Sequence, residues 1–313
     1  MSPTLSPSTA PIGVFDSGIG GLSVLRALRA ALPHERFVYL ADSAHAPYGE
    51  QGDAYVAART EAIAHHLLQT YGIKALVVAC NTATAAAIAE VRARYPALPL
   101  VGVEPALKPA LSLTQTGRVG VIATRGTLAS GKFGRLRASL EGPVQFAVQP
   151  CDGLALAIER STADARDTDP ATAEVRALCE RYTAALAPFG TGHGEIDTLV
   201  LGCTHYIFAE QALRACTGPA VRFVETGEPV ARQTRRLLEA AGALAPVSTP
   251  DGEAVRLLTT GELPLLQAAA QRWLGLPARC CAQVLVPTLA SGAHSQAFSA
   301  LTATHQAQAA INL

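Results

Sequence analysis

Two segments of this chain are near-duplicates, and each ends an apolar run in a cysteine. Residues 73–82 read IKALVVACNT, and residues 196–205 read IDTLVLGCTH. Continuous apolar runs of this length are typical of strands buried on both faces of a sheet. We therefore expect Cys80 and Cys203 at the carboxyl ends of two equivalent strands, which is the edge where open α/β sheets bind ligands.

A second repeat indicates that the duplication extends over whole domains. Residues 12–15 read IGVF and residues 119–122 read VGVI, and a turn of small residues follows each of these expected strands. Further apolar strands alternate with segments of helical periodicity, such as residues 53–70 and 84–95, a pattern typical of βαβ units on a parallel sheet. The sequence thus predicts an α/β protein of two similar three-layer domains with mostly parallel sheets. Internal pseudo-symmetry relates the two domains, and the active site lies between them.

The length of 313 residues favours two domains over one. We expect residues 1–10 to be a disordered leader. Residues 11–106 and 219–285 are predicted to form the first domain, and residues 107–218 the second. Residues 286–313 form a carboxy-terminal extension without an assigned structure.

Composition narrows the class of function. Apolar residues make up 49% of the chain, and its formal net charge is zero, so no basic face is available to bind nucleic acid. No run approaches the roughly 18 apolar residues of a membrane helix, and the first residues do not resemble a secretory signal. The seven cysteines form no CxxC pair, which favours reduced thiols in the cytoplasm over a disulfide framework.

The chemistry expected at the shared edge begins with the two thiols, because a thiolate is a strong base and nucleophile. His205 lies two residues after Cys203, which on an extended segment puts both side chains on the same side. Asp16 ends the first strand of the first half and could meet Cys80 there, as its proton partner or as an anchor for a substrate cation. An Asx turn or a helix cap ahead of SGIGG is the alternative for Asp16.

Small hydroxyl and amide side chains stand beside the expected strand ends and helix starts. Together with helix N-termini they suit carboxylate ligands, although each Ser or Thr also fits a helix cap. They are Ser17, Asn81, Thr82, Thr84, Thr124, Thr127 and Thr204.

The residues alone leave other functions open. The turn DSGIGG is a weak signal for a nucleotide because it lacks the GxGxxG spacing. Cys80, Cys203, His205 and Asp16 could together ligate zinc. The two thiols could form a redox dithiol, and one of them would be enough for a nucleophilic hydrolase.

Five motifs then occur in a fixed order along the chain. They are VFDSGIGGLSVL at 14–25, DSAHAPYGE at 42–50, VVACNTAT at 77–84, VIATRGTLASGKF at 121–133 and LVLGCTHY at 199–206. In this order they resemble the motifs of the cofactor-independent aspartate/glutamate racemases. The PYG motif resembles the one that distinguishes the branch acting on glutamate. The similarity runs from about residue 11 to about residue 275.

The resemblance implies a two-base 1,1-proton transfer at the α-carbon of glutamate. One cysteine thiolate removes the proton, and the opposite thiol delivers another. By the same resemblance, Cys80 takes the proton from D-glutamate with the help of Asp16, and Cys203 takes it from L-glutamate with the help of His205. Glu159, in CDGLALAIE, matches a further family carboxylate on the Cys203 side, and an exposed glutamate at a helix end is its alternative.

The resemblance also implies the substrate contacts. These are Asp16, Ser17, Pro47, Tyr48, Gly49, Asn81, Thr82, Thr124, Thr127, Thr204 and His205. The α-amino acid head group would lie at Ser17, Asn81, Thr82 and Thr204, and the side-chain carboxylate would lie at the PYG turn.

Beyond the site, the resemblance implies a cytoplasmic isomerase that uses neither pyridoxal phosphate nor a metal. It also implies a homodimer that supplies D-glutamate for peptidoglycan synthesis. A racemase of aspartate or another amino acid is the nearest alternative. A zinc or dithiol binding protein is the alternative of a different class.

Overall fold

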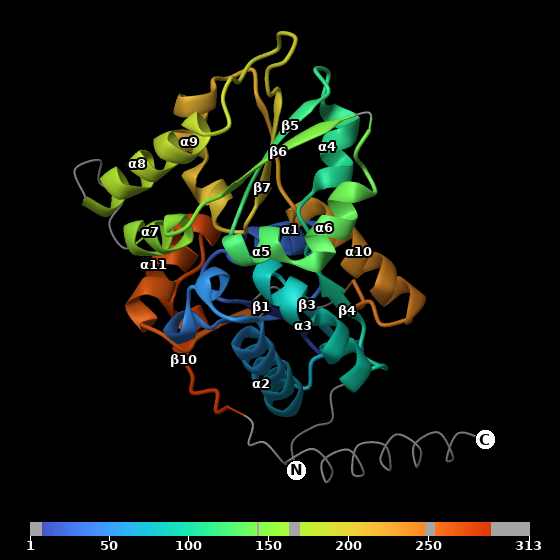
Figure 1. Cartoon of the computed structure of the whole chain (residues 1–313). Helices are drawn as coiled ribbons and strands as arrows, with labels where there is room; N and C mark the ends of the chain where they lie inside the picture. The colour runs from blue at the N-terminus through green and yellow to red at the C-terminus, as the bar shows by residue number, and fades with distance from the viewer. Residues whose placement is uncertain (1–7, 143, 163–169, 248–253, 289–313) are drawn as a thin grey trace, which may run out of the picture.

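The parallel α/β architecture predicted from the sequence is confirmed. A computed structural model describes residues 8–142, 144–162, 170–247 and 254–288 (Figure 1). These residues form two parallel sheets. Helices pack on both faces of each sheet through clusters of buried apolar side chains. The loops at the carboxyl ends of both sheets line one pocket.

The first sheet contains six parallel strands in the order β10-β9-β2-β1-β3-β4. These strands are β1 (Ile12–Asp16), β2 (Phe37–Ala41), β3 (Ala75–Val78), β4 (Leu100–Gly102), β9 (Val255–Thr259) and β10 (Cys281–Gln283). Helices α1 (Leu22–Ala31), α10 (Gly227–Ala240) and α11 (Leu263–Leu274) cover one face, and α2 (Asp53–Tyr71) and α3 (Asn81–Arg94) cover the other. The central β1 is buried along its whole length, as its continuous apolar run predicts.

The second sheet contains four parallel strands in the order β6-β5-β7-β8. These strands are β5 (Arg118–Ala123), β6 (Gln145–Pro150), β7 (Thr198–Gly202) and β8 (Arg222–Val224). Figure 1 shows α8 (Pro170–Ala184) and α9 (Glu210–Thr217) on one side of this sheet, and α4 (Leu107–Leu113) and α6 (Gly131–Ala138) on the other. The helices α5 (Arg125–Ala129) and α7 (Leu154–Ser161) begin close to the carboxyl ends of β5 and β6.

Four short 3-10 helices complete the described secondary structure. They are η1 (Ser43–His45), η2 (Tyr48–Glu50), η3 (Tyr206–Ala209) and η5 (Ala278–Cys280).

The internal repeat has a structural counterpart. The order β2-β1-β3-β4 in the first sheet matches β6-β5-β7-β8 in the second. Gly13 in β1 lies so close to Ile73 that an added Cβ would be 2.7 Å from its Cδ1, and an added Cβ on Gly120 in β5 would be 3.2 Å from Cγ2 of Ile196. Both glycines let the isoleucine before the thiol-bearing strand pack on the central strand, so the sequence repeat preserves a packing contact.

Three details differ from the sequence-based boundaries. The boundary at residue 219 is too early, because β8 pairs with β7 and therefore belongs to the second sheet. The boundary at residue 286 is also wrong, because Val286 is buried in the first domain and its carbonyl accepts a hydrogen bond from Arg59. Residues 1–7 and 289–313 of the predicted leader and extension lie outside the described residues, but the Ser8 carbonyl accepts a hydrogen bond from Lys74 of the first domain.

The helix after Cys80 begins at Asn81, three residues before the start expected from its periodicity. The thiol itself explains the difference, because Sγ of Cys80 accepts a hydrogen bond from the Ala83 amide at 3.4 Å and so caps the helix. Within the described part of the chain, no helix combines the length and apolar character needed to cross a membrane.

Candidate active site

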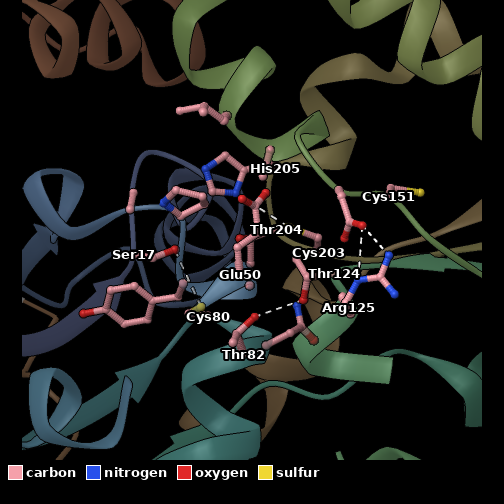
Figure 2. A pocket seen from close by; sticks show the side chains of 18 of the residues that line it. Ser17, Glu50, Cys80, Thr82, Thr124, Arg125, Cys151, Cys203, Thr204 and His205 are labelled. Atoms are coloured by element: carbon pink, nitrogen blue, oxygen red, sulfur yellow. Dashed lines mark hydrogen bonds and ion pairs between the residues drawn. The ribbon is translucent and has the colours of Figure 1, made fainter. Parts of the chain in front are cut away.

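The pocket between the two sheets has an empty volume of about 590 Å³, part of it open to solvent. Residues that follow the carboxyl ends of β1, β2 and β3 line it from the first domain, and residues that follow β5, β6 and β7 line it from the second. Of the residues predicted for the site, it is lined by Ser17, Pro47, Tyr48, Gly49, Cys80, Asn81, Thr82, Thr124, Glu159, Cys203, Thr204 and His205. Figure 2 shows how the labelled side chains converge from both domains.

Cys80 lies at the carboxyl end of β3 as expected, and its thiol is hydrogen-bonded to the side chain of a serine. Its thiol donates a hydrogen bond to Oγ of Ser17 at 3.7 Å, and that hydroxyl donates to Oδ1 of Asp16 at 3.1 Å. Burial raises the pKa of Cys80 to about 12, and the nearby negative charge of Asp16 adds to this effect. Cys80 is therefore a neutral thiol near pH 7, and Ser17 lies between it and the carboxylate predicted to be its partner.

Of the readings that the sequence left open for Asp16, the structure shows the Asx turn. Its Oδ1 accepts a hydrogen bond from the Gly18 amide at 3.1 Å, which forms the Asx turn. Its Oδ2 accepts one from the Thr204 hydroxyl of the second domain at 2.8 Å. Burial raises the pKa of Asp16, against the lowering effect of the positive charge of His205 and of these hydrogen bonds. Asp16 therefore both shapes its own turn and connects the two halves of the site.

On the opposite side, Cys203, His205 and Glu159 form a chain of hydrogen bonds. Sγ of Cys203 is 3.7 Å from Nδ1 of His205, and Nε2 of that ring is 2.7 Å from Oε1 of Glu159. The Ile19 amide of the first domain donates to the same Glu159 oxygen at 2.6 Å. Glu159 is buried, which argues against the alternative of an exposed glutamate at a helix end.

The His205 imidazole is held in its charged form. Burial alone lowers its pKa, but the hydrogen bonds and negative charges of Cys203 and Glu159 raise the pKa well above its ordinary value. The resulting imidazolium places a positive charge beside the Cys203 sulfur, where it stabilises a thiolate. The two sides of the pocket thus differ: Cys80 is a neutral thiol near a carboxylate, whereas the Cys203 sulfur lies beside the hydrogen-bonded pair of His205 and Glu159.

A second group of polar side chains lies at the junction of α3 and α5. Oγ1 of Thr82 is 3.0 Å from Oγ1 of Thr124, and the Thr124 hydroxyl donates to Oγ1 of Thr127 at 2.9 Å. Thr124 also caps α5 by accepting from the Thr127 amide, so its role as a helix cap and its place in the pocket coexist. Beside them, buried Asn81 has no hydrogen-bond partner at either amide atom among the residues that the structure describes. Its side chain therefore has donor and acceptor capacity available for a ligand.

Glycines permit the close contact between the halves. A Cβ on Gly20 would be 2.5 Å from Oγ1 of Thr204, and a Cβ on Gly49 would be 2.6 Å from Cβ of Thr124. The turn that the sequence left open as a weak nucleotide signal thus packs against the second domain. This packing explains Gly18 and Gly20, because a Cβ on either would meet a residue of the second domain, whereas a Cβ on Gly21 would meet Asp16 and Tyr39 of the first.

Tyr48 lines the pocket, but its hydroxyl points elsewhere. It donates to Oδ2 of Asp42 at 2.6 Å, so a ligand beside this turn would meet the backbone and ring of Tyr48. Cys151, which the sequence analysis did not single out, is buried and also lines the pocket. Its position directly after β6 follows the strand-end rule, which could have identified it.

Within the described ranges, no group of three or more His, Cys, Asp or Glu side chains is arranged to hold a metal ion. Cys80 is instead hydrogen-bonded to Ser17 and Ala83, and Asp16 to Thr204. Cys203 is hydrogen-bonded to His205, which is in turn bonded to Glu159. The geometry thus gives no support to the zinc alternative.

Comparison with known proteins agrees with this geometry. Residues 12–234 match the Asp/Glu/Hydantoin racemase family. A glutamate racemase of Ectopseudomonas mendocina is 47% identical over 271 residues, which cover 87% of this chain and 97% of the relative. A crystal structure of a glutamate racemase isoform from Bacillus anthracis is similar with a TM-score of 0.75 and 30% identity, over 90% of this chain and 100% of that one. The Escherichia coli glutamate racemase, crystallised with L-glutamate and the activator UDP-MurNAc-Ala, is similar with a TM-score of 0.71 and 30% identity, over 84% of this chain and 95% of that one.

Proposed function

This chain belongs to the Asp/Glu/Hydantoin racemase family, and from that membership we infer that it is an isomerase that interconverts L- and D-glutamate. We propose a two-base mechanism, in which Cys80 and Cys203 exchange protons with opposite faces of the α-carbon. The observation that carries the mechanism is the pair of buried thiols at equivalent strand ends of one pocket, each in its own hydrogen-bond chain.

With L-glutamate, the Cys203 thiolate takes the α-proton. The Cα–H bond breaks, and its electron pair stays on the substrate, delocalised into the adjacent carboxylate. Cys80 then gives its thiol proton to the opposite face, which forms D-glutamate and leaves Cys80 as the thiolate. The reverse reaction begins from that state. Because the pKa of Cys80 is raised to about 12, the thiol is protonated and ready to donate when L-glutamate binds.

Hydroxyl, amide and backbone groups would hold the two substrate carboxylates. Asn81 has unpaired amide atoms in the pocket, and Thr204 and Thr82 lie on opposite domains beside it. The hydroxyl of Thr124, which is hydrogen-bonded to Thr127 outside the pocket lining, would receive the side-chain carboxylate together with the turn at Gly49. Enclosure by two domains and preorganised donors would stabilise the developing negative charge.

We further propose a cytoplasmic location and a role in supplying D-glutamate for peptidoglycan. All seven cysteines are free thiols, as expected in a reducing compartment, and the relative with 47% identity is bacterial. A homodimer remains a prediction from the family resemblance, and light scattering would test it.

Loss of optical activity from L-glutamate tests the proposal directly. Purified, chelator-treated protein without added cofactor should racemise glutamate and should act much more slowly on aspartate. Cys80→Ala and Cys203→Ala should each reduce kcat/KM by about 10²–10⁴-fold or more. Cys216→Ala, which removes a thiol outside the pocket, is the matched control and should retain activity. Faster turnover of aspartate, or no turnover of either substrate by folded wild type, would overturn the substrate assignment.

A further inference from the structure

A buried ion pair lies directly behind the pocket turn that contains Tyr48. Nη2 and Nε of Arg59 donate to the two carboxylate oxygens of Asp42 at 2.8 and 3.0 Å. Oδ2 of Asp42 also accepts the Tyr48 hydroxyl at 2.6 Å, and Oδ1 accepts the Thr260 hydroxyl at 2.9 Å. The Asp42 carboxylate thus joins α2, the turn at η2 and the loop after β9.

Neither residue of the ion pair lines the pocket directly. Arg59 is 2% exposed and Asp42 is fully buried, yet neither is among the pocket-lining residues. The third guanidinium nitrogen of Arg59, Nη1, donates to the Val286 carbonyl at 3.0 Å. This bond connects the carboxy-terminal segment to the ion pair. Two buried charges held by this many hydrogen bonds fix one geometry, because leaving either charge unpaired in the interior is costly.

We propose that Asp42 and Arg59 are positioning residues that hold the Pro47–Tyr48–Gly49 turn in its substrate-binding geometry. The inference rests on the glutamate racemase function proposed above, and it assigns a role to residues that the mechanism does not use. Asp42 fixes Tyr48 through the phenol hydroxyl, and Arg59 fixes Asp42. The turn at Gly49 is thereby kept against Thr124, at the hydroxyl end of the pocket.

This arrangement affects binding rather than proton transfer. The hydrogen bonds of the thiols go to Ser17, Ala83 and His205, and no described hydrogen bond joins them to the ion pair. Loosening the turn would weaken its grip on the side-chain carboxylate and leave the two bases in place. The equilibrium constant between enantiomers is 1 by symmetry, so kcat/KM must change equally for L- and D-glutamate. If kcat is unchanged, KM must therefore rise by one common factor.

Arg59→Lys and Tyr48→Phe are the informative variants. Arg59→Lys keeps the positive charge but loses the bidentate geometry, and Tyr48→Phe removes only the hydroxyl that binds Asp42. Each should raise KM for both enantiomers about five- to tenfold with kcat within about twofold of wild type, as expected for one weakened hydrogen bond. The double variant should resemble the single variants, because both changes break one chain of contacts.

Lys74→Arg is the matched control. It perturbs another buried ion pair of the same domain, in which Lys74 contacts Glu35 at 2.5 Å away from the pocket. This variant should change thermal stability but not KM. A fall in kcat at unchanged KM, multiplicative KM effects in the double variant, or an equal KM rise in Lys74→Arg would overturn the positioning role. Unchanged KM in active variants refutes this inference alone, whereas a wild type inactive on glutamate refutes the proposed function and with it the positioning role.

Discussion

At the scale of single residues, Asn81 has the environment that most clearly indicates a ligand. It is 4% exposed and lacks a partner at both amide atoms, so Asn81→Ala removes no hydrogen bond from the fold. We expect kcat/KM to fall about 10- to 100-fold, the effect of losing a bond to a charged substrate group, with little change in Tm. Thr60→Ala, which breaks a buried bond to the Val56 carbonyl outside the pocket lining, should show the opposite pattern in the same assays.

The charge of Glu159 should control the pH range of activity. Glu159→Gln keeps the shape but removes a negative charge that raises the pKa of His205. The pKa of His205 should then fall, so the imidazolium loses its proton at lower pH. The alkaline limb of the kcat/KM profile should move to lower pH by about one unit or more. Glu141→Gln, which changes an exposed pair with Arg137, should leave the profile in place. An alkaline limb that stays at the wild-type pH in Glu159→Gln would contradict this role.

Residue-level prediction from sequence succeeded for positions and for the local pair Cys203–His205, and it missed partners from distant segments. Cys80 and Cys203 lie at strand ends because apolar runs fix where strands finish. The link from Cys80 through Ser17 depends on the pairing of β1 with β3 in the first sheet, and the bond from Thr204 to Asp16 depends on how the two domains meet. The Tyr48 hydroxyl likewise turns to Asp42 because Arg59 makes that carboxylate a strong acceptor. Pairings between distant segments have no signal in local spacing.

At the scale of elements, the turn between β1 and α1 is expected to tolerate no side chain at position 20. A Cβ on Gly20 would meet the His205 ring and Thr204, although the backbone there would accept alanine. Gly20→Ala should therefore displace the hydrogen-bonded chain of Cys203, His205 and Glu159 and reduce kcat/KM on the order of 10²-fold. Gly134→Ala, on the exposed side of α6 with open space around it, should keep full activity and gain about 0.5–1 kcal/mol of stability. Equal activity in the two variants would contradict the close contact.

The elements themselves were largely predictable. Alternation of short apolar runs with helical periods gave the parallel sheets, because each pattern buries one kind of surface. The start of α3 was misplaced because Cys80 takes the capping position, an uncommon role for a thiol. β8 was assigned to the wrong domain because a three-residue strand has no pattern that selects one sheet over another.

At the scale of the whole molecule, the carboxy-terminal segment is expected to affect substrate binding. A chain ending at Gln283 lacks the Val286 carbonyl that accepts from Arg59 and the buried Val286 side chain. We expect it to lose about 2 kcal/mol of stability and to show a several-fold higher KM for both enantiomers. A chain ending at Thr288 keeps both contacts and should match the full chain. Equal KM values for the two truncations would show that the segment does not support the turn.

The contacts between the two domains are the feature of the structure that the sequence predicts least. Hydrogen bonds from Ile19 to Glu159, from Ser23 to the Thr204 carbonyl and from Gly153 to Glu50 all join one domain to the other. The internal repeat predicted two similar halves and a site between them. It could not predict which atoms would meet, because that depends on the packing of surfaces far apart in the chain.

Deuterium incorporation during early turnover tests the two-base account most directly. L-Glutamate would be incubated with the protein in D₂O to a few per cent conversion, and the α-position of each separated enantiomer would be analysed by mass spectrometry. Because the donating thiol equilibrates with solvent, we predict nearly complete deuterium in the D-glutamate product and almost none in the remaining L-glutamate. Product that retains the original proton, or substrate labelled as fast as product, would show that a single base serves both faces and would contradict the account.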